Sequence, residues 1–109
     1  MQRGPDQDDA ADPLLSRVDE LKRALDALDA RGASDVELLD LRSKVSRLTL
    51  AVIVSELAKE DPAYVESMSE LDRAIGAIDA ANQDASEVAT AVRTAAKSVA
   101  LVEKALAVL

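Results

Sequence analysis

Residues 12–32 read DPLLSRVDELKRALDALDARG, and this stretch decides the fold class. Its large apolar residues recur at alternating intervals of four and three, at Leu14, Val18, Leu21, Leu25 and Leu28. That spacing places one apolar stripe along an α-helix. Asp12 is a favourable N-cap, Pro13 suits the first helical position, and Gly32 is a typical helix stop. We therefore predict a helix over about residues 13–31.

Three further segments carry the same kind of pattern, and we predict helices over about residues 35–60, 62–81 and 85–108. Their stripes are Leu38, Leu41, Val45, Leu48 and Val52; then Tyr64, Met68, Leu71, Ile75 and Ile78; then Val88, Val92, Ala95, Val99, Val102, Leu106 and Leu109. Capping residues precede each segment, namely Ser34 with Glu37, Asp61 before Pro62, and Asp84 with Glu87. Short turns between amphipathic helices predict an all-α antiparallel four-helix bundle of two tandem hairpins over residues 12–109, with each helix beside the next.

An internal similarity links the first and third helices. Residues 20–30, ELKRALDALDA, align with residues 70–80, ELDRAIGAIDA. The repeated order of start signal, stripe and turn favours duplication of a helical hairpin, which predicts a bundle with pseudo-two-fold symmetry. The alternative is that any two alanine-rich amphipathic helices share composition and period. Gly76 interrupts the third helix, either because another helix approaches closely or as a tolerated flaw.

The composition argues against catalysis. The chain has no histidine and no cysteine, so the commonest general base, transition-metal ligand and thiol nucleophile are missing. No glycine-rich phosphate loop is present, and the carboxylates lie off the apolar stripes. We expect a protein that is not an enzyme and that binds no metal, cofactor or small-molecule substrate. Tyr64, the single aromatic residue, is expected in the core with its hydroxyl near a bundle end.

The charge balance narrows the class of partner. The net charge is -8, which disfavours nucleic acid and anionic membrane surfaces. The basic cluster Arg42, Lys44 and Arg47 follows Asp40 and is interpreted as a solvated helix face. Residues 1–11 are polar and acidic, and we expect a disordered tail there. No apolar run is long enough to span a bilayer, so a cytoplasmic location is expected. No motif assigns a family, and the composition is typical of small acidic bacterial helical bundles.

Two sets of residues are candidates for a protein interface. The first is apolar. We expect the Leu50–Val54 stretch to be the most buried part of the molecule. We also expect the long fourth helix to project beyond the bundle and leave its last apolar residues uncovered. The second is acidic and lies on the third helix. The candidate residues are Leu50, Ile53, Val54, Leu106, Val108, Leu109, Glu66, Glu70, Asp72 and Asp79.

From these features we expect a non-enzymatic protein–protein interaction module that acts as an adaptor, inhibitor or chaperone-like protein. The alternative is a structural scaffold that assembles with itself. The expected partner is accordingly another protein, a second copy of this chain, or both.

Overall fold

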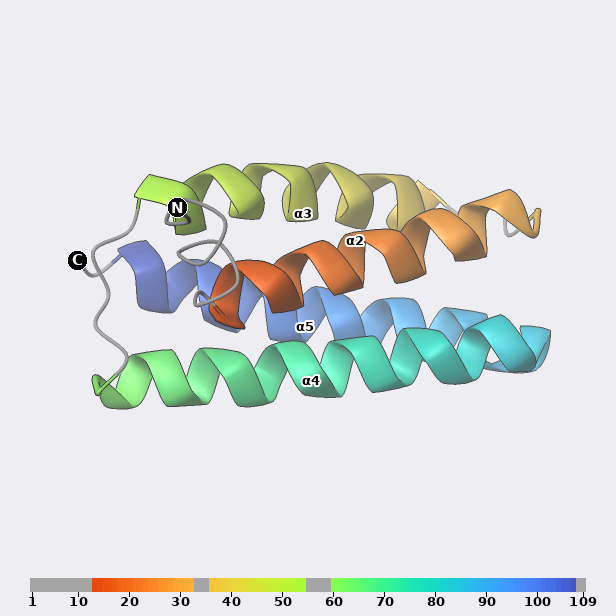
Figure 1. Ribbon diagram of the computed structural model, residues 1–109. Coiled ribbons are helices and arrows are strands. Elements are labelled where there is room, and N and C mark those ends of the chain that lie inside the picture. The colour runs from red at the N-terminus through yellow and green to blue at the C-terminus, as the bar shows by residue number, and fades with distance from the viewer. Residues whose placement is uncertain (1–12, 33–35, 55–59, 108–109) are drawn as a thin grey trace, which may run out of the picture.

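The computed structural model describes residues 13–32, 36–54 and 60–107. These residues form four α-helices, α2 (Pro13–Ala30), α3 (Val36–Val54), α4 (Pro62–Gln83) and α5 (Val88–Ala107), with the short 3₁₀ helix η1 (Ala85–Glu87) before α5 (Figure 1). No strand occurs within the described ranges. The predicted all-α bundle of four helices is therefore confirmed.

The helix ends differ from the prediction in places. The described part of α3 ends at Val54, and Glu60 lies in a turn where helix was expected. At the fourth helix, the Asp84 carboxylate accepts a hydrogen bond from the backbone N–H of Ser86 at 3.0 Å, and the N–H of Glu87 bonds to the Asp84 carbonyl at 3.0 Å. This tight cap turns residues 85–87 into η1, so the regular α-helix begins at Val88.

Of the other predicted helix start and stop signals, those at Asp61 and Gly32 are confirmed. Asp61 caps α4 as predicted, since its side chain accepts from the N–H of Ala63 at 2.9 Å. Gly32 has the positive φ of 91° that a left-handed helix stop requires. The predicted tail over residues 1–11, the cap at Asp12 and the capping box at Ser34 lie outside the described residues.

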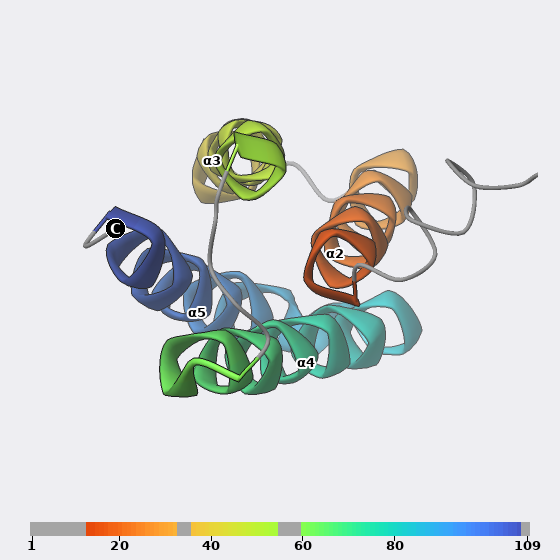
Figure 2. The ribbon, with the colours of Figure 1, turned by 60° about the vertical axis from the view of Figure 1, so that its left-hand side comes forward.

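The helices pair as two antiparallel hairpins, α2 with α3 and α4 with α5 (Figure 1). Between the hairpins, α2 packs on α4 and α3 packs on α5, and both of these pairs run parallel. Figure 2 shows α3 and α4 at opposite corners of the bundle, although they are consecutive in the chain. The prediction that the third helix lies beside the second is therefore wrong.

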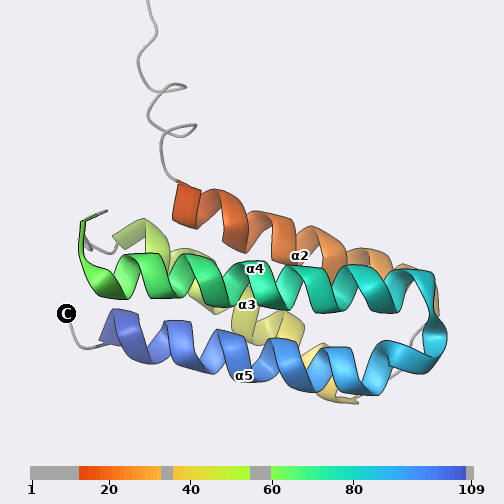
Figure 3. The ribbon, with the colours of Figure 1, turned by 90° about the horizontal axis from the view of Figure 1, so that it is seen from below.

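The reason lies in the two sides of α4, which is flanked by α2 and α5 (Figure 3). Its contact with α5 is the most extensive in the molecule. Small buried side chains recur there at intervals of seven, at Ser67, Ala74 and Ala81. Small residues let helix axes approach closely. With both sides of α4 occupied, α3 takes the diagonal position.

The two hairpins are also not related by the pseudo-two-fold symmetry that was expected. α2 lies beside α4, α3 lies beside α5, and each of these pairs runs parallel. One hairpin is therefore laid on the other with equivalent helices side by side. A two-fold axis along the bundle would instead place equivalent helices on the diagonals. The predicted pseudo-two-fold symmetry is therefore wrong, whereas duplication of the hairpin stays a prediction.

The predicted core is largely confirmed. All five stripe residues of α2 and all five of α3 are buried. In α4 the stripe residues Tyr64, Leu71 and Ile78 are buried, and Met68 and Ile75 between them are partly buried. In α5 the stripe is buried from Val92 to Val102, and Val88 and Leu106 at its ends are partly buried. Each of the four helices thus contributes one apolar face to a single core.

Polar contacts hold α2 in place against its two neighbours. The hydroxyl of Tyr64 accepts a hydrogen bond from the N–H of Leu14 at 3.1 Å, and the amide of Asn82 donates to the carbonyl of Ala24 at 3.1 Å. On the other side, Arg42 of α3 contacts the carboxylates of Asp26 at 2.9 Å and Asp29 at 3.1 Å. These contacts set the position of α2 along both α4 and α3.

Candidate protein interface

A second stripe runs along α3 on the side away from the core. We call it the outer face of α3 and define it as Val36, Leu39, Ser43, Ser46, Leu50 and Ile53. The intervals alternate between three and four, as in the core stripe, so the six residues share one side of the helix. The four large members are 83, 56, 65 and 58% exposed at Val36, Leu39, Leu50 and Ile53, respectively. None of the six carries a charge, so α3 presents an uncharged strip to solvent.

The expectation that Leu50–Val54 is the most buried stretch is wrong. Val52 is buried at 4% exposure, whereas Leu50, Ile53 and Val54 are largely exposed. The physical reason is that α3 contacts the bundle through α2 and α5 on one side, and no described helix covers its other side. The exposure leaves these residues accessible to a partner, and their role in an interface stays a prediction.

Charged and polar residues flank the outer face of α3 along its two edges. Asp40 and Arg47 lie along one edge, and Arg42 and Thr49 lie along the other. Arg42 is held by the two α2 carboxylates, and Lys44 pairs with Asp40 at 3.1 Å. Two of the three basic residues on this helix, Arg42 and Lys44, are therefore engaged in ion pairs. The interpretation of the cluster as a solvated face stays a prediction.

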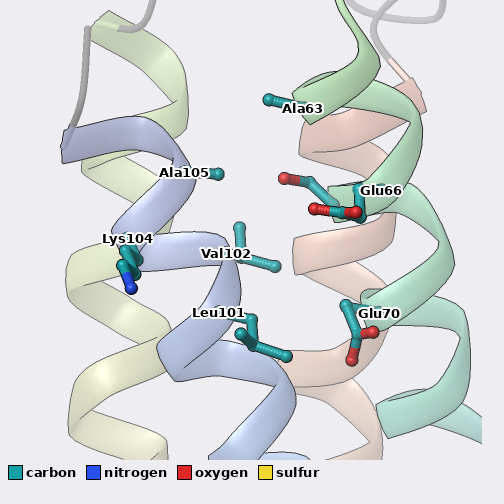
Figure 4. A pocket seen from close by; sticks show the side chains of 8 residues that line it. Ala63, Glu66, Glu70, Leu101, Val102, Lys104 and Ala105 are labelled. Carbon is teal, nitrogen blue, oxygen red and sulfur yellow. The ribbon is translucent and has the colours of Figure 1, made fainter.

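A groove of about 520 Å³ lies between α4 and α5. Figure 4 shows Glu66 and Glu70 on α4 facing Leu101 and Val102 on α5. Ser67 also lines the groove, and its buried hydroxyl has no hydrogen-bond partner among the described residues. The α4 wall of the groove is thus acidic, whereas the α5 wall is apolar except for Lys104.

The four acidic candidates on α4 do not form one patch. Glu66 and Glu70 lie on the α5 side, where Glu70 accepts hydrogen bonds from Ser98 at 3.2 Å and Arg73 at 3.0 Å. Asp72 lies on the opposite flank and pairs with Arg17 of α2 at 2.6 Å. Asp79 lines a separate shallow groove between α2 and α4. Part of the predicted acidic surface is therefore used in contacts inside the molecule.

The last apolar residues of the fourth helix were expected to be uncovered, and for Leu106 this expectation is wrong. Leu106 is partly buried and packs against the core, which is the opposite of the exposure expected for it. Val108 and Leu109 lie outside the described residues. Of the three candidates on the last helix, the structure describes Leu106, and it is less exposed than the large residues of the outer face of α3.

Four exposed apolar residues were missed by the sequence analysis, namely Val36, Leu39, Val65 and Leu101. The signal for the first two was present in the sequence. A second series at intervals of three and four joins Val36 and Leu39 to Leu50 and Ile53 through two serines. No comparable series was available for Val65 or Leu101.

The pKa of Asp84 lies below its ordinary value because the Ser86 hydroxyl and the Ser86 backbone N–H both donate hydrogen bonds to its carboxylate. The lowered pKa therefore reflects the role of Asp84 as an exposed helix cap. Across residues 13–32, 36–54 and 60–107, no group of three or more carboxylates could hold a metal ion. Of the helices in these ranges, none has the length and apolar character needed to cross a bilayer.

Comparisons of the chain with protein-family models, with curated proteins and with solved structures found no match.

Proposed function

We propose that this chain is a non-enzymatic protein–protein interaction module whose contact surface is the outer face of α3. The observation that carries the proposal is the uncharged, exposed stripe opposite the core stripe of the same helix. Exposed apolar side chains aligned along a helix are typical of surfaces that bind other proteins. We further propose that the module acts in the cytoplasm.

The spacing and apolar character of the stripe indicate what kind of surface the partner has. A helix with its own apolar residues at intervals of three and four would fit it, because each side chain of one helix then packs between side chains of the other. Binding through an uncharged strip with charges only along its edges should depend weakly on salt. Binding of a basic partner at Glu66 and Glu70 would weaken as salt rises. The salt dependence of binding therefore distinguishes the outer face of α3 from the α4–α5 groove.

Site-specific photo-crosslinking tests the proposal. A photoreactive residue placed at Ser43 lies at the centre of the outer face of α3, and one placed at Ser69 lies at an exposed position on α4. We expect adducts in the native cell from the Ser43 position and not from the Ser69 position. The adducts should disappear when Leu39→Glu and Leu50→Glu are combined. Equal adduct yields at Ser43 and Ser69 would overturn the proposal.

The second candidate function is a structural scaffold that assembles with itself, and the same stripe favours it. A self-assembling chain would give adducts of two copies in purified protein, without any other component. An adaptor or inhibitor would give adducts only when its partner is present.

A further inference from the structure

We propose that the outer face of α3 binds the same face of a second copy of this chain, with the two α3 helices antiparallel about a two-fold axis between Ser43 and Ser46. The inference rests on the proposed function, because it names the partner of the surface proposed there. Three properties of the stripe support it, namely its self-complementary order, the charges along its edges and its length.

The order of residues along the stripe is self-complementary. In an antiparallel pair centred between the two serines, Val36 lies opposite the partner's Ile53 and Leu39 lies opposite the partner's Leu50. Ser43 lies opposite the partner's Ser46 in the middle layer. Apolar residues therefore meet apolar residues at both ends, and hydroxyls that both donate and accept hydrogen bonds meet at the centre. All six residues are exposed in the single chain.

The flanking charges select the antiparallel orientation. In antiparallel coiled-coil packing each edge of one stripe meets the same edge of the other, so Asp40 lies near the partner's Arg47 at two symmetric places. In parallel packing opposite edges meet, and Arg42 would lie near the partner's Arg47 at two places. Opposite charges thus support the antiparallel pair, whereas the parallel pair brings no opposite charges together at these positions. Asp40 is 62% exposed at its side chain while paired with Lys44, so it remains accessible to a second chain.

The length of the contact sets how tight the pairing should be. α3 has 19 residues and spans about 28 Å. One helix from each copy gives an interface at the small end of those that are stable. We therefore expect a dimer that forms and dissociates with protein concentration, and whose helices fold whether or not it forms.

Engineered cysteines test the register, because the chain has none of its own. In the antiparallel pair a cysteine at position 39 lies opposite position 50 of the partner, and two copies of position 39 are about 16 Å apart along the axis. A disulfide needs Cα atoms within about 7 Å. We expect an equimolar mixture of Leu39→Cys and Leu50→Cys chains to form the mixed disulfide dimer, and each variant alone to form little. Equally rapid dimer formation by Leu39→Cys alone would overturn the proposal.

Charge reversal tests the edge contacts. Asp40→Arg and Arg47→Asp each place like charges together at two sites and should weaken homodimerisation about tenfold. A mixture of the two variants restores both opposite-charge contacts and should form the heterodimer at the wild-type concentration. Glu20→Arg, a reversal at an exposed position on α2, is the matched control and should have no effect. Failure of the mixture to recover would count against the antiparallel pairing.

Sedimentation equilibrium decides whether the pairing exists. The wild-type mass should rise with concentration from the 11.5 kDa of one chain towards twice that value. The Leu39→Glu/Leu50→Glu variant should stay at the mass of one chain with unchanged helical circular dichroism. A wild-type mass that remains that of one chain up to about 1 mM would overturn the dimer. The proposed function would still stand if Ser43 then gave adducts with a different protein in the cell, and both would fail if it gave none.

Discussion

The hydroxyl of Tyr64 accepts a hydrogen bond from the backbone N–H of Leu14, 3.1 Å away. Leu14 lies in the first turn of α2, where a backbone N–H has no acceptor within its own helix. Tyr64 lies in the first turn of α4, so a side chain of the second hairpin caps a helix of the first. Both residues are buried, and the contact keeps the starts of the two parallel helices at the same end of the bundle.

Tyr64→Phe removes this cap without removing the ring. We expect the free energy of unfolding to fall by about 1–2 kcal/mol, because the N–H of Leu14 loses its acceptor in a buried place. Urea denaturation measures the loss of stability, and hydrogen exchange at the Leu14 amide reports the cap directly. If that amide exchanged no faster in the variant, the hydrogen bond would not be the source of the change.

Leu48 and Leu50 form a matched pair two residues apart on α3, one facing the core and the other facing solvent. Leu48→Ala should lower the free energy of unfolding by about 3 kcal/mol, because it leaves a cavity in the core. Leu50→Ala should change it by less than about 0.5 kcal/mol. Chemical denaturation of both variants at a concentration low enough to exclude association provides the test. A large loss of stability for Leu50→Ala would mean that its side chain is covered in the single chain.

Gly76 offers a stabilising substitution. A Cβ atom placed on it meets no atom within 4 Å, so the close helix approach considered in the sequence analysis is absent. Gly76→Ala should raise the free energy of unfolding by about 1 kcal/mol, since alanine favours the helix interior. Gly32→Ala is the opposing control and should lower the unfolding free energy, because φ at that position is +91°. Thermal unfolding of the two variants should give midpoint shifts of opposite sign.

Asp84 should titrate at an unusually low pH for an aspartate. The hydrogen bonds from the Ser86 hydroxyl and backbone N–H stabilise its charged form and lower its pKa in the folded chain. The resulting contribution to stability is present above the pKa of the unfolded chain, at about pH 4, and is lost as the pH falls through the lower folded value. Carbon-detected NMR titration should show that Ser86→Ala moves the pKa upward. An unchanged pKa in that variant would exclude the hydroxyl as a cause.

The sequence predicts the four helices well but does not predict which helices lie next to one another. Alternating apolar intervals identify a helix and its stripe from local spacing alone, and the stripes of α2 and α3 are all buried as predicted. The neighbours of α4 depend on contacts between distant segments. The seam of Ser67, Ala74 and Ala81 and the Tyr64 cap of α2 become visible as contacts only in the folded chain.

For the candidate interface, too, the sequence predicts which residues share a side of α3 but not whether that side is exposed. The apolar residues at the end of α3 were expected inside the molecule, whereas the structure exposes Leu50, Ile53 and Val54. Their role in an interface stays a prediction. The spacing of side chains on a helix follows from covalent geometry and the helical repeat, so periodicity specifies which residues share a side. Which of two apolar sides of α3 is covered depends on how many helices pack around it. The number of helices that cover α3 is set by how all four helices pack against one another, and it cannot be read from the local spacing of apolar residues.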